Sequence, residues 1–209
     1  DRLYLNDGKG RFEKKQDFLP VMTTSTSSVV ASDFDNDGDL DLFVGGRLIP
    51  GAYPLAPKSY ILQNKGNGQF KNVTGTVAPD MEHLGMVTDA LWSDFDADGA
   101  EELIVVGEFM GIRLFKYLNG TFTEQKDSGL SNTEGWWNTI KAGDFDTDGD
   151  IDYILGNHGL NTQLKPSIGE PLELFAKDFD GNESIDPILC AYFDGKSYPV
   201  FSKDDLVGQ

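Results

Sequence analysis

Residues Asp33–Gly46 read DFDNDGDLDLFVGG. Carboxylates occupy every second position of the first nine residues, Gly38 interrupts them, and an apolar run follows at once. Bound calcium accounts for this crowding, because Ca²⁺ takes about six to eight oxygen ligands. In a tight loop the side chains at positions one, three, five and nine and the backbone carbonyl at position seven can converge on one ion. Glycine at position six permits the sharp bend that such a loop needs.

The pattern returns three times along the chain. It recurs closely as SDFDADGAEELIVVGE from Ser93 and as GDFDTDGDIDYILGNHG from Gly143, and more loosely as KDFDGNESIDPIL from Lys177. Repetition favours a metal site over an acidic solvated turn, since four or five carboxylates in one small loop repel one another without a cation. The four acidic loops, numbered in chain order, are residues 33–41, 94–102, 144–152 and 178–186.

The predicted ligands occupy the same five positions in each acidic loop, with position seven contributing its carbonyl. They are Asp33, Asp35, Asp37, Asp39 and Asp41; Asp94, Asp96, Asp98, Ala100 and Glu102; Asp144, Asp146, Asp148, Asp150 and Asp152; and Asp178, Asp180, Asn182, Ser184 and Asp186. The fourth loop has Glu183 where the others have glycine, which leaves its occupancy open. We therefore expect three to four calcium ions with a structural role.

An EF-hand shares the first half of this spacing but requires a glutamate at position twelve and flanking helices. Position twelve is Val44, Val105 or Leu155 in the first three acidic loops, each inside an apolar run rich in β-branched and aromatic residues. These runs predict strands, so the EF-hand interpretation fails.

A second repeat predicts tight turns between strands. NDGKGRF from Asn6 and NKGNGQF from Asn64 share the pattern N-x-G-x-G-x-F, whose Asn and Gly residues accept positive φ. Each repeat then contains four antiparallel strands, with the acidic loop between the first two. The sequence thus predicts an all-β fold, a partial β-propeller of about three to four four-stranded blades.

The predicted propeller fragment is one domain over residues 1–209. Residues 1–20 are the tail of a preceding blade, and blades follow at 21–78, 79–127 and 128–209. The segment LELFAKDFDGNESIDPILCAYF is interpreted as the third and fourth strands of the last blade, and a truncated fourth blade is the alternative. Because so few blades do not close, we expect further blades from a parent chain or self-association.

Composition narrows the class of partner. The 209 residues carry a net charge of −18, which disfavours nucleic acid because like charges repel. No apolar stretch approaches the length of a membrane span. The single cysteine, Cys190, allows no internal disulfide.

The acidic loops and the apolar runs that follow them resemble FG-GAP/VCBS repeats, the units of the integrin α-subunit propeller. The resemblance extends from about residue 1 to residue 200, and GWWNTIKAGDFDTDGDIDY is further similar to large exported repeat proteins of Bacteroidetes-type bacteria. It implies a propeller with calcium in the loop that joins the first two strands of a blade. It does not specify a function, because sites are grafted on the fold.

Loops on the rim opposite the acidic loops are the candidate place for ligand binding. The candidate contact residues are Arg47, Trp136, Trp137 and His158. Two adjacent tryptophans in a Gly- and Asn-rich context suit stacking on a sugar or contact with a protein. We therefore expect an extracellular, cell-surface or periplasmic module that binds protein or glycan, with cell adhesion as one use. A polysaccharide lyase or hydrolase and a structural spacer are the alternatives.

Overall fold

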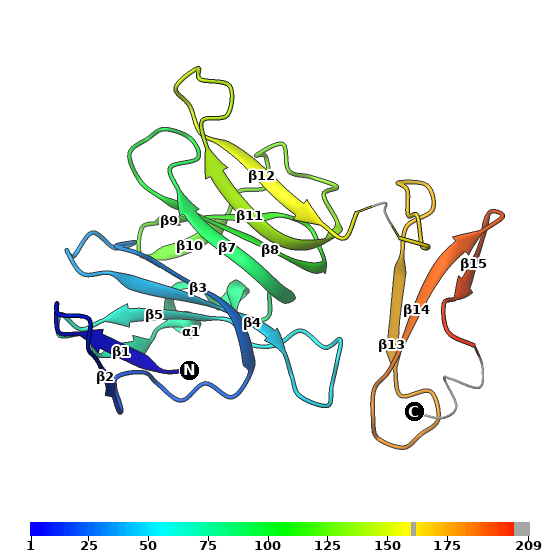
Figure 1. Cartoon of the computed structure of the whole chain (residues 1–209), viewed down its shortest axis with the longest axis horizontal. Coiled ribbons are helices and arrows are strands. Elements are labelled where there is room, and N and C mark those ends of the chain that lie inside the picture. Colours follow the sequence, from blue (N-terminus) through cyan, green and yellow to red (C-terminus); the bar gives the residue numbers. More distant parts are fainter. Residues whose placement is uncertain (160–161, 203–209) are drawn as a thin grey trace.

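The computed structural model describes residues 1–159 and 162–202, which consist almost entirely of antiparallel β-strands and their connections (Figure 1). The predicted all-β fold is confirmed. The strands form several sheets, and none of them closes on itself within the described ranges. Two short helices, α1 (Thr74–Val77) and η1 (Pro79–Met81), lie in one connection between sheets. No helix in this part of the chain is long and apolar enough to cross a membrane.

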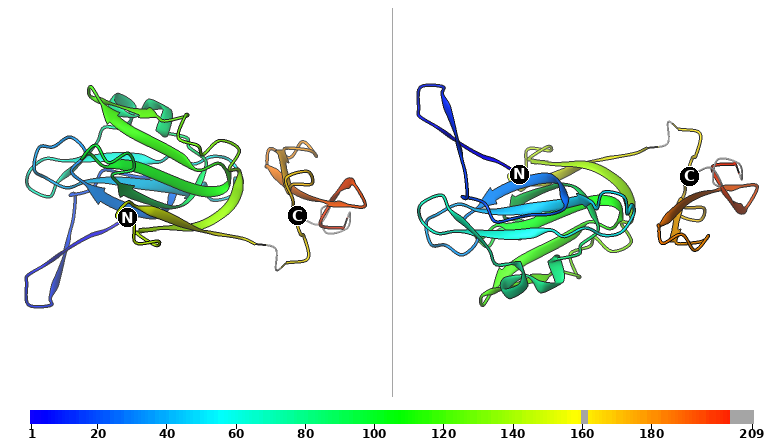
Figure 2. Two further views of the ribbon diagram at one scale, coloured as in Figure 1. Left: turned by 90° about the horizontal axis from the view of Figure 1, so that it is seen from above. Right: turned by 90° about the horizontal axis from the view of Figure 1, so that it is seen from below.

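The N-terminal part contains a hairpin and a four-stranded sheet. The hairpin pairs β1 (Leu3–Asn6) with β2 (Phe12–Lys15) and projects from the remaining strands (Figure 2). The sheet has the order β3-β4-β5-β6, as expected for one repeat. Its strands are β3 (Ser25–Ser32), β4 (Asp41–Leu48), β5 (Tyr60–Asn64) and β6 (Phe70–Asn72).

The next strands repeat this order and then continue into a further pair. Strands β7 to β10 pair consecutively, β11 pairs with β12, and the start of β11 joins the end of β8 through Trp136 opposite Glu108. The strands are β7 (Met86–Ser93), β8 (Glu102–Met110), β9 (Arg113–Leu118), β10 (Thr121–Glu124), β11 (Gly135–Gly143) and β12 (Asp152–Asn157).

The C-terminal strands differ from the expected arrangement. β13 (Glu173–Lys177), β14 (Asp186–Phe193) and β15 (Lys196–Pro199) form their own three-stranded sheet, which stands apart from the other strands (Figures 1 and 2). Within the described residues they pair with neither β11 nor β12, so they are not observed as the third and fourth strands of that unit. Their order matches the first three strands of a repeat, and their assignment to the last predicted blade or to a truncated further one stays a prediction.

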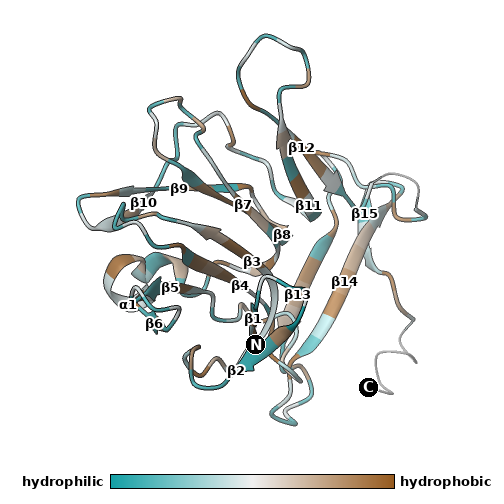
Figure 3. Ribbon diagram, turned by 60° about the vertical axis from the view of Figure 1, so that its left-hand side comes forward, coloured by the Kyte–Doolittle hydropathy of each residue, from teal (hydrophilic) through white to brown (hydrophobic). Residues whose placement is uncertain are grey.

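Packing of the central strands explains their unbroken apolar sequence. Alternate side chains of β8 point to opposite faces of its sheet. Leu103 and Val105 pack into a core shared with the first four-stranded sheet, whereas Ile104 and Val106 pack against β11 and β12. Because both faces are covered, residues 103–106 of β8 are uniformly hydrophobic rather than alternating. Brown hydrophobic stretches mark β3, β4 and β8 in Figure 3.

Glycines near the end of each second strand bring neighbouring backbones close together. Gly46, Gly107 and Gly156 lie opposite first-strand residues beside a shift in register. A Cβ at Gly107 would lie 2.3 Å from the carbonyl oxygen of Met86, and one at Gly46 would lie 2.3 Å from that of Lys58. Only glycine fits these approaches, so the VGG and VGE stretches are requirements of packing.

Candidate metal centres

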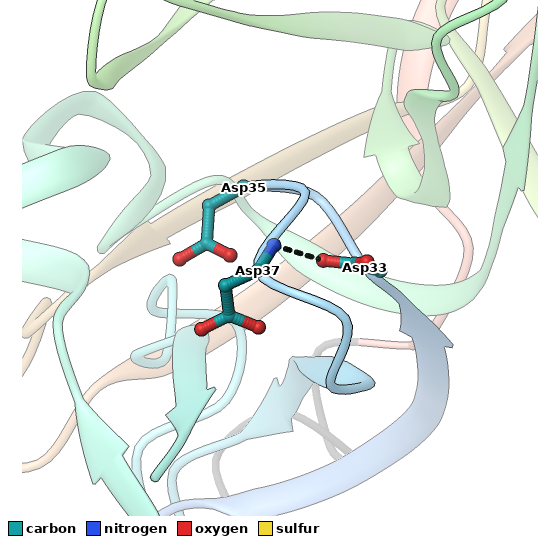
Figure 4. Close-up of side chains that lie close together, drawn as sticks. All are labelled: Asp33, Asp35 and Asp37. Atoms are coloured by element: carbon teal, nitrogen blue, oxygen red, sulfur yellow. Dashed lines mark hydrogen bonds between the residues drawn. The ribbon is translucent and has the colours of Figure 1, made fainter. Parts of the chain in front are cut away.

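The four acidic loops share one backbone conformation. Each joins two antiparallel strands, namely β3–β4, β7–β8, β11–β12 and β13–β14. The carboxylate at position one accepts backbone N–H groups from the far side of the loop. In the first loop Asp33 accepts N–H groups of Asp37 and Gly38, each at 3.0 Å, and the first of these bonds is drawn in Figure 4. The acidic side chain therefore folds the loop as well as offering oxygen to a cation.

Two positions in every loop are left-handed, although the sequence indicated only one. Position six has φ of 94°, 90° and 100° at its three glycines, and Glu183 takes the same conformation at 68°. Position four is also left-handed, with φ of 58° at Asn36, 55° at Ala97, 67° at Thr147 and 79° at Gly181. The fourth loop thus carries its glycine at position four rather than six, and Glu183 does not change the shape of the loop.

The structure brings together three carboxylates in each loop, with one oxygen from each lying within 4.8 Å of the others. Positions one and three always take part. In the first loop the third member is Asp37 at position five, whereas in the other loops it is position nine. The four groups are Asp33, Asp35 and Asp37 (Figure 4); Asp94, Asp96 and Glu102; Asp144, Asp146 and Asp152; and Asp178, Asp180 and Asp186.

The remaining predicted ligands lie in the same loops but outside these groups. Asp41, Asp98 and Asp148 are the carboxylates left out. The metal-ligand role stays a prediction for the side chain of Asn182 and for the backbone carbonyls of Asp39, Ala100, Asp150 and Ser184.

The first loop holds carboxylate oxygens that lack a protein partner. Asp41 is fully buried, and its Oδ1 accepts the N–H of Asn64 at 2.7 Å. Its Oδ2 and Oδ1 of Asp35 are buried without a hydrogen-bond partner among the described residues. Burial raises the pKa of Asp41 to about 6, the N–H of Asn64 opposes this shift, and the nearby carboxylates of Asp35, Asp37 and Asp33 add to it. Unpartnered buried anions of this kind fit a hard divalent cation.

The hairpin turn after β5 is tied to the first acidic loop. Oδ1 of Asn64 accepts the N–H groups of Gly66 and Gly68 at 3.1 Å each. Its Nδ2 donates to the carbonyl of Leu40 at 3.2 Å, and its own N–H donates to Asp41. The two sequence repeats therefore meet in space, and Asn64 couples the turn to the acidic loop, a role that its turn motif alone did not reveal.

The second loop contains a side chain that the sequence analysis missed. Lys116, on β9, places Nζ 2.7 Å from Asp96, 2.6 Å from Asp98 and 2.9 Å from Glu102. Burial lowers the pKa of Lys116, but the interactions of its ammonium with the three accepting carboxylates outweigh burial and raise it. The bond from Lys116 in turn lowers the pKa of Asp98. The signal available in the sequence was a lysine across the strand pair from Glu102.

The third and fourth loops are more exposed to solvent. Phe145 and Phe179 donate their N–H groups at 2.9 Å to the position-nine carboxylates Asp152 and Asp186. Repulsion by Asp148 raises the pKa of Asp150. These loops therefore keep their shape through their own hydrogen bonds while concentrating negative charge.

The side chains of the candidate contact residues have different partners. Arg47 forms an ion pair with Glu108, and its Nη2 lies 2.5 Å from Oε1 of Glu108. Trp137 packs against the core between β8 and β12, and its Nε1 donates to the carbonyl of Thr133 at 2.9 Å. Trp136 instead stacks on His158, with ring centroids 4.7 Å apart at an interplanar angle of 17°. Of the predicted contact residues, Trp136 and His158 are the pair that the structure brings together.

Phe109, which lies in the predicted rim loop after the second strand, extends this stack. Its ring centroid lies 5.0 Å from that of Trp136. The three rings line a cavity of about 910 Å³, together with residues 132, 134, 135, 157, 159, 166–168, 171 and 172. This aromatic cluster (Phe109, Trp136 and His158) lies at the opposite end of β11 and β12 from the third acidic loop.

Comparison with known families identifies the repeats. A family model described as FG-GAP-like repeat matches residues 1–44 and 94–155. The chain belongs to this family. The matches cover about half of the chain and contain the first three acidic loops, so the FG-GAP-like match is narrower than the resemblance expected from residue 1 to about 200. The fourth loop lies outside the matched residues. No curated protein matches the chain.

Proposed function

We propose that this FG-GAP-like chain forms part of a calcium-stabilised β-propeller that binds protein or glycan outside the cell or in the periplasm. The observation that carries the calcium assignment is the first acidic loop, where Asp35 and Asp41 each keep a buried oxygen without a partner among the described residues. A divalent cation would compensate both oxygens and the repulsion among the neighbouring carboxylates.

The first strands of successive repeats pack against one another, and this arrangement supports the propeller. β3, β7 and β11 lie beside one another (Figure 1). Oγ of Ser27 donates to the carbonyl of Val87 at 2.6 Å, and Oγ1 of Thr88 donates to that of Trp137 at 2.8 Å. Blades arranged around an axis bring their innermost strands together in this way.

The proposed blades follow the pairing of strands. In this proposal the blade at residues 21–78 has strands β3–β6 and the blade at 79–127 has strands β7–β10, with the start of β11 paired to the end of β8. The region 128–209 then contributes β11–β12 to one blade and β13–β15 to a further, truncated one.

Calcium acts structurally in this proposal. When bound, it supplies positive charge that holds a loop of carboxylates at the junction of two strands. Asp33, Asp35 and Asp37 in the first loop, and the carboxylates at positions one, three and nine in the others, would orient around that charge, and the backbone N–H groups keep position one in place. Three to four such ions would offset much of the net charge of −18. Calcium at millimolar concentration outside the cytoplasm suits sites of moderate affinity.

The aromatic cluster is the proposed ligand-binding surface. The partly exposed face of Trp136, next to His158 and Phe109, offers flat apolar area beside polar groups of the cavity. Such surfaces recognise sugar rings and protein side chains.

Calcium should raise the thermal stability of the protein. We expect a higher melting temperature in Ca²⁺ than in EGTA, together with three to four bound ions by metal analysis, because a ligand of the folded state stabilises by RT ln(1 + [L]/Kd). Mg²⁺ at the same concentration is the control and should give a smaller shift, since it requires a tighter octahedral shell. Equal melting temperatures in Ca²⁺ and EGTA, without bound metal, would refute the calcium role.

Replacing Trp136 should remove binding to the glycan or protein found by screening the calcium-loaded chain on glycan and surface-protein arrays. Trp136→Ala deletes the ring that stacks on His158 and is expected to weaken binding at least tenfold, the scale of an aromatic anchor. Tyr4→Ala, on the projecting hairpin, removes another exposed ring and should leave binding unchanged. Equal affinity of Trp136→Ala and the unaltered chain would exclude this surface.

A further inference from the structure

Gln63 and Lys116 occupy the same place in successive sheets. Leu42 lies opposite Leu62 in the first sheet, and Leu103 lies opposite Phe115 in the second. One residue further toward the acidic loop, Gln63 therefore corresponds to Lys116, just as Asp41 corresponds to Glu102. Both side chains reach the loop carboxylates, since Nε2 of Gln63 donates to Asp35 at 2.6 Å.

The two side chains bring different charge to otherwise similar loops. A glutamine amide is neutral and satisfies one oxygen, which leaves buried oxygens of the first loop without a partner. The ammonium of Lys116 carries a full positive charge and three N–H donors. It meets three carboxylates, those of Asp96, Asp98 and Glu102, at 2.6–2.9 Å. The side chain of Lys116 is only 10% exposed, so these charges interact with little solvent between them.

Two members of the second carboxylate group, Asp96 and Glu102, are thus bound to the lysine. A calcium ion entering this loop would lie within a few ångströms of an ammonium and would have to compete for the same oxygens. Moving Lys116 aside would remove its hydrogen bonds to Asp96 and Asp98 and its ion pair with Glu102 from a nearly buried cation. Oε1 of Glu102 is also buried without a hydrogen-bond partner among the described residues, but here an ammonium lies 2.9 Å from it. The second loop therefore does not fit a divalent ion in the way that the first loop does.

We propose that Lys116 is a built-in cation that replaces calcium in the second acidic loop and makes it independent of metal. This inference rests on the proposed calcium function of the other loops, of which it would leave three as candidate sites. According to this inference, the residue on the third strand that lies opposite position nine of the acidic loop determines whether the loop holds a metal ion or a lysine ammonium.

Because of where the second loop lies, the proposed replacement of calcium by Lys116 affects the stability of the core. The sheet β7–β10 packs on the first four-stranded sheet through one face and on β11 and β12 through the other. A metal-independent loop in this sheet keeps the shared core assembled when calcium is low. The strands joined by the other three acidic loops, β3–β4, β11–β12 and β13–β14, are then the parts whose stability follows calcium concentration.

A reciprocal exchange of the two side chains tests the proposal. Calcium stoichiometry is measured by isothermal titration calorimetry with CaCl₂ on chelator-treated protein and checked by metal analysis. Lys116→Gln should bind one more Ca²⁺ per chain than the unaltered protein, and Gln63→Lys should bind one fewer. Lys9→Gln, on the exposed hairpin, makes the same chemical change as Lys116→Gln and should leave the stoichiometry unchanged.

Each result has a defined meaning. If Lys116→Gln and the unaltered chain bind the same number of calcium ions, the lysine proposal is overturned, whether that number is zero or three. An unaltered chain that binds none, together with a Lys116→Gln variant that binds one, refutes the wider calcium function but supports the role of Lys116. If Lys116→Gln does not fold without calcium, Gln63→Lys decides, because retention of every ion in that variant overturns the proposal.

Discussion

Asp89→Ala is expected to lower the free energy of unfolding by about 3 kcal/mol, because one carboxylate on β7 joins three neighbouring strands. Its Oδ1 accepts Oγ of Ser28 on β3 at 3.3 Å, and its Oδ2 accepts three donors of β11. The β11 donors are Oγ1 of Thr139 at 2.7 Å, the N–H of Ile140 at 3.1 Å and Nζ of Lys141 at 3.3 Å. Alanine would leave these donors unpaired at the junction of two proposed blades.

Urea unfolding at pH 7 gives the measurement for Asp89, and thermal unfolding should show a fall of roughly 6–12 °C in the melting temperature. Asp127→Ala is the matched control, since this aspartate is exposed and its loss should change stability by less than about 0.5 kcal/mol. A loss in Asp89→Ala no larger than that of the control would show that the blades are held together by apolar packing alone.

The same contacts give this effect a pH dependence. Burial raises the pKa of Asp89, but hydrogen bonds from Thr139, Ile140, Ala90 and Lys141 outweigh burial and lower it. A carboxylate with a lowered folded-state pKa contributes stability above its unfolded pKa and loses it as the pH falls through the folded value. The stability difference between Asp89→Ala and the unaltered chain should therefore shrink below about pH 4.

Local features of the sequence predicted the acidic loops and the strands that flank them. Alternating carboxylates around Gly38 and the apolar run after Asp41 describe a turn followed by a buried strand, and both depend on residues close together in the chain. The N-x-G-x-G-x-F pattern predicted the hairpins for the same reason, because the side chain of Asn64 bonds the glycines just beyond it.

Features that depend on pairing between distant residues were not predictable in this way. Lys116 reaches the second loop through the register of β8 and β9, which the spacing within the loop does not encode. Likewise the segment from Glu173 to Pro199 could supply either the last two strands of one unit or the first three of another, and only strand pairing distinguishes them. The sequence did not indicate the left-handed residue at position four, and the occupancy of the fourth loop stays a prediction.

Asp41→Asn is expected to have opposite effects with and without calcium. In EGTA the variant should be more stable than the unaltered chain by roughly 1–2 kcal/mol, because it removes a fully buried negative charge that is repelled by Asp33, Asp35 and Asp37. In saturating Ca²⁺ the order should reverse, since the variant lacks the charge that the proposed ion would balance. If the first site is lost entirely, about 4 kcal/mol of stabilisation disappears at a calcium concentration of one thousand times Kd.

The reversal separates a metal ligand from a structural side chain. The control is Asp7→Asn, an exposed aspartate of the N-terminal hairpin turn, whose stability should shift equally in both buffers. If Asp41 served only to accept the N–H of Asn64, asparagine could accept the same bond through its carbonyl, and calcium would stabilise both proteins alike. A variant whose stability differs from that of the unaltered chain by the same amount in EGTA and in Ca²⁺ would therefore assign Asp41 to the hairpin. A change of sign between the two buffers would assign it to the cation, because only a bound positive charge makes a buried carboxylate preferable to a neutral amide of nearly the same shape.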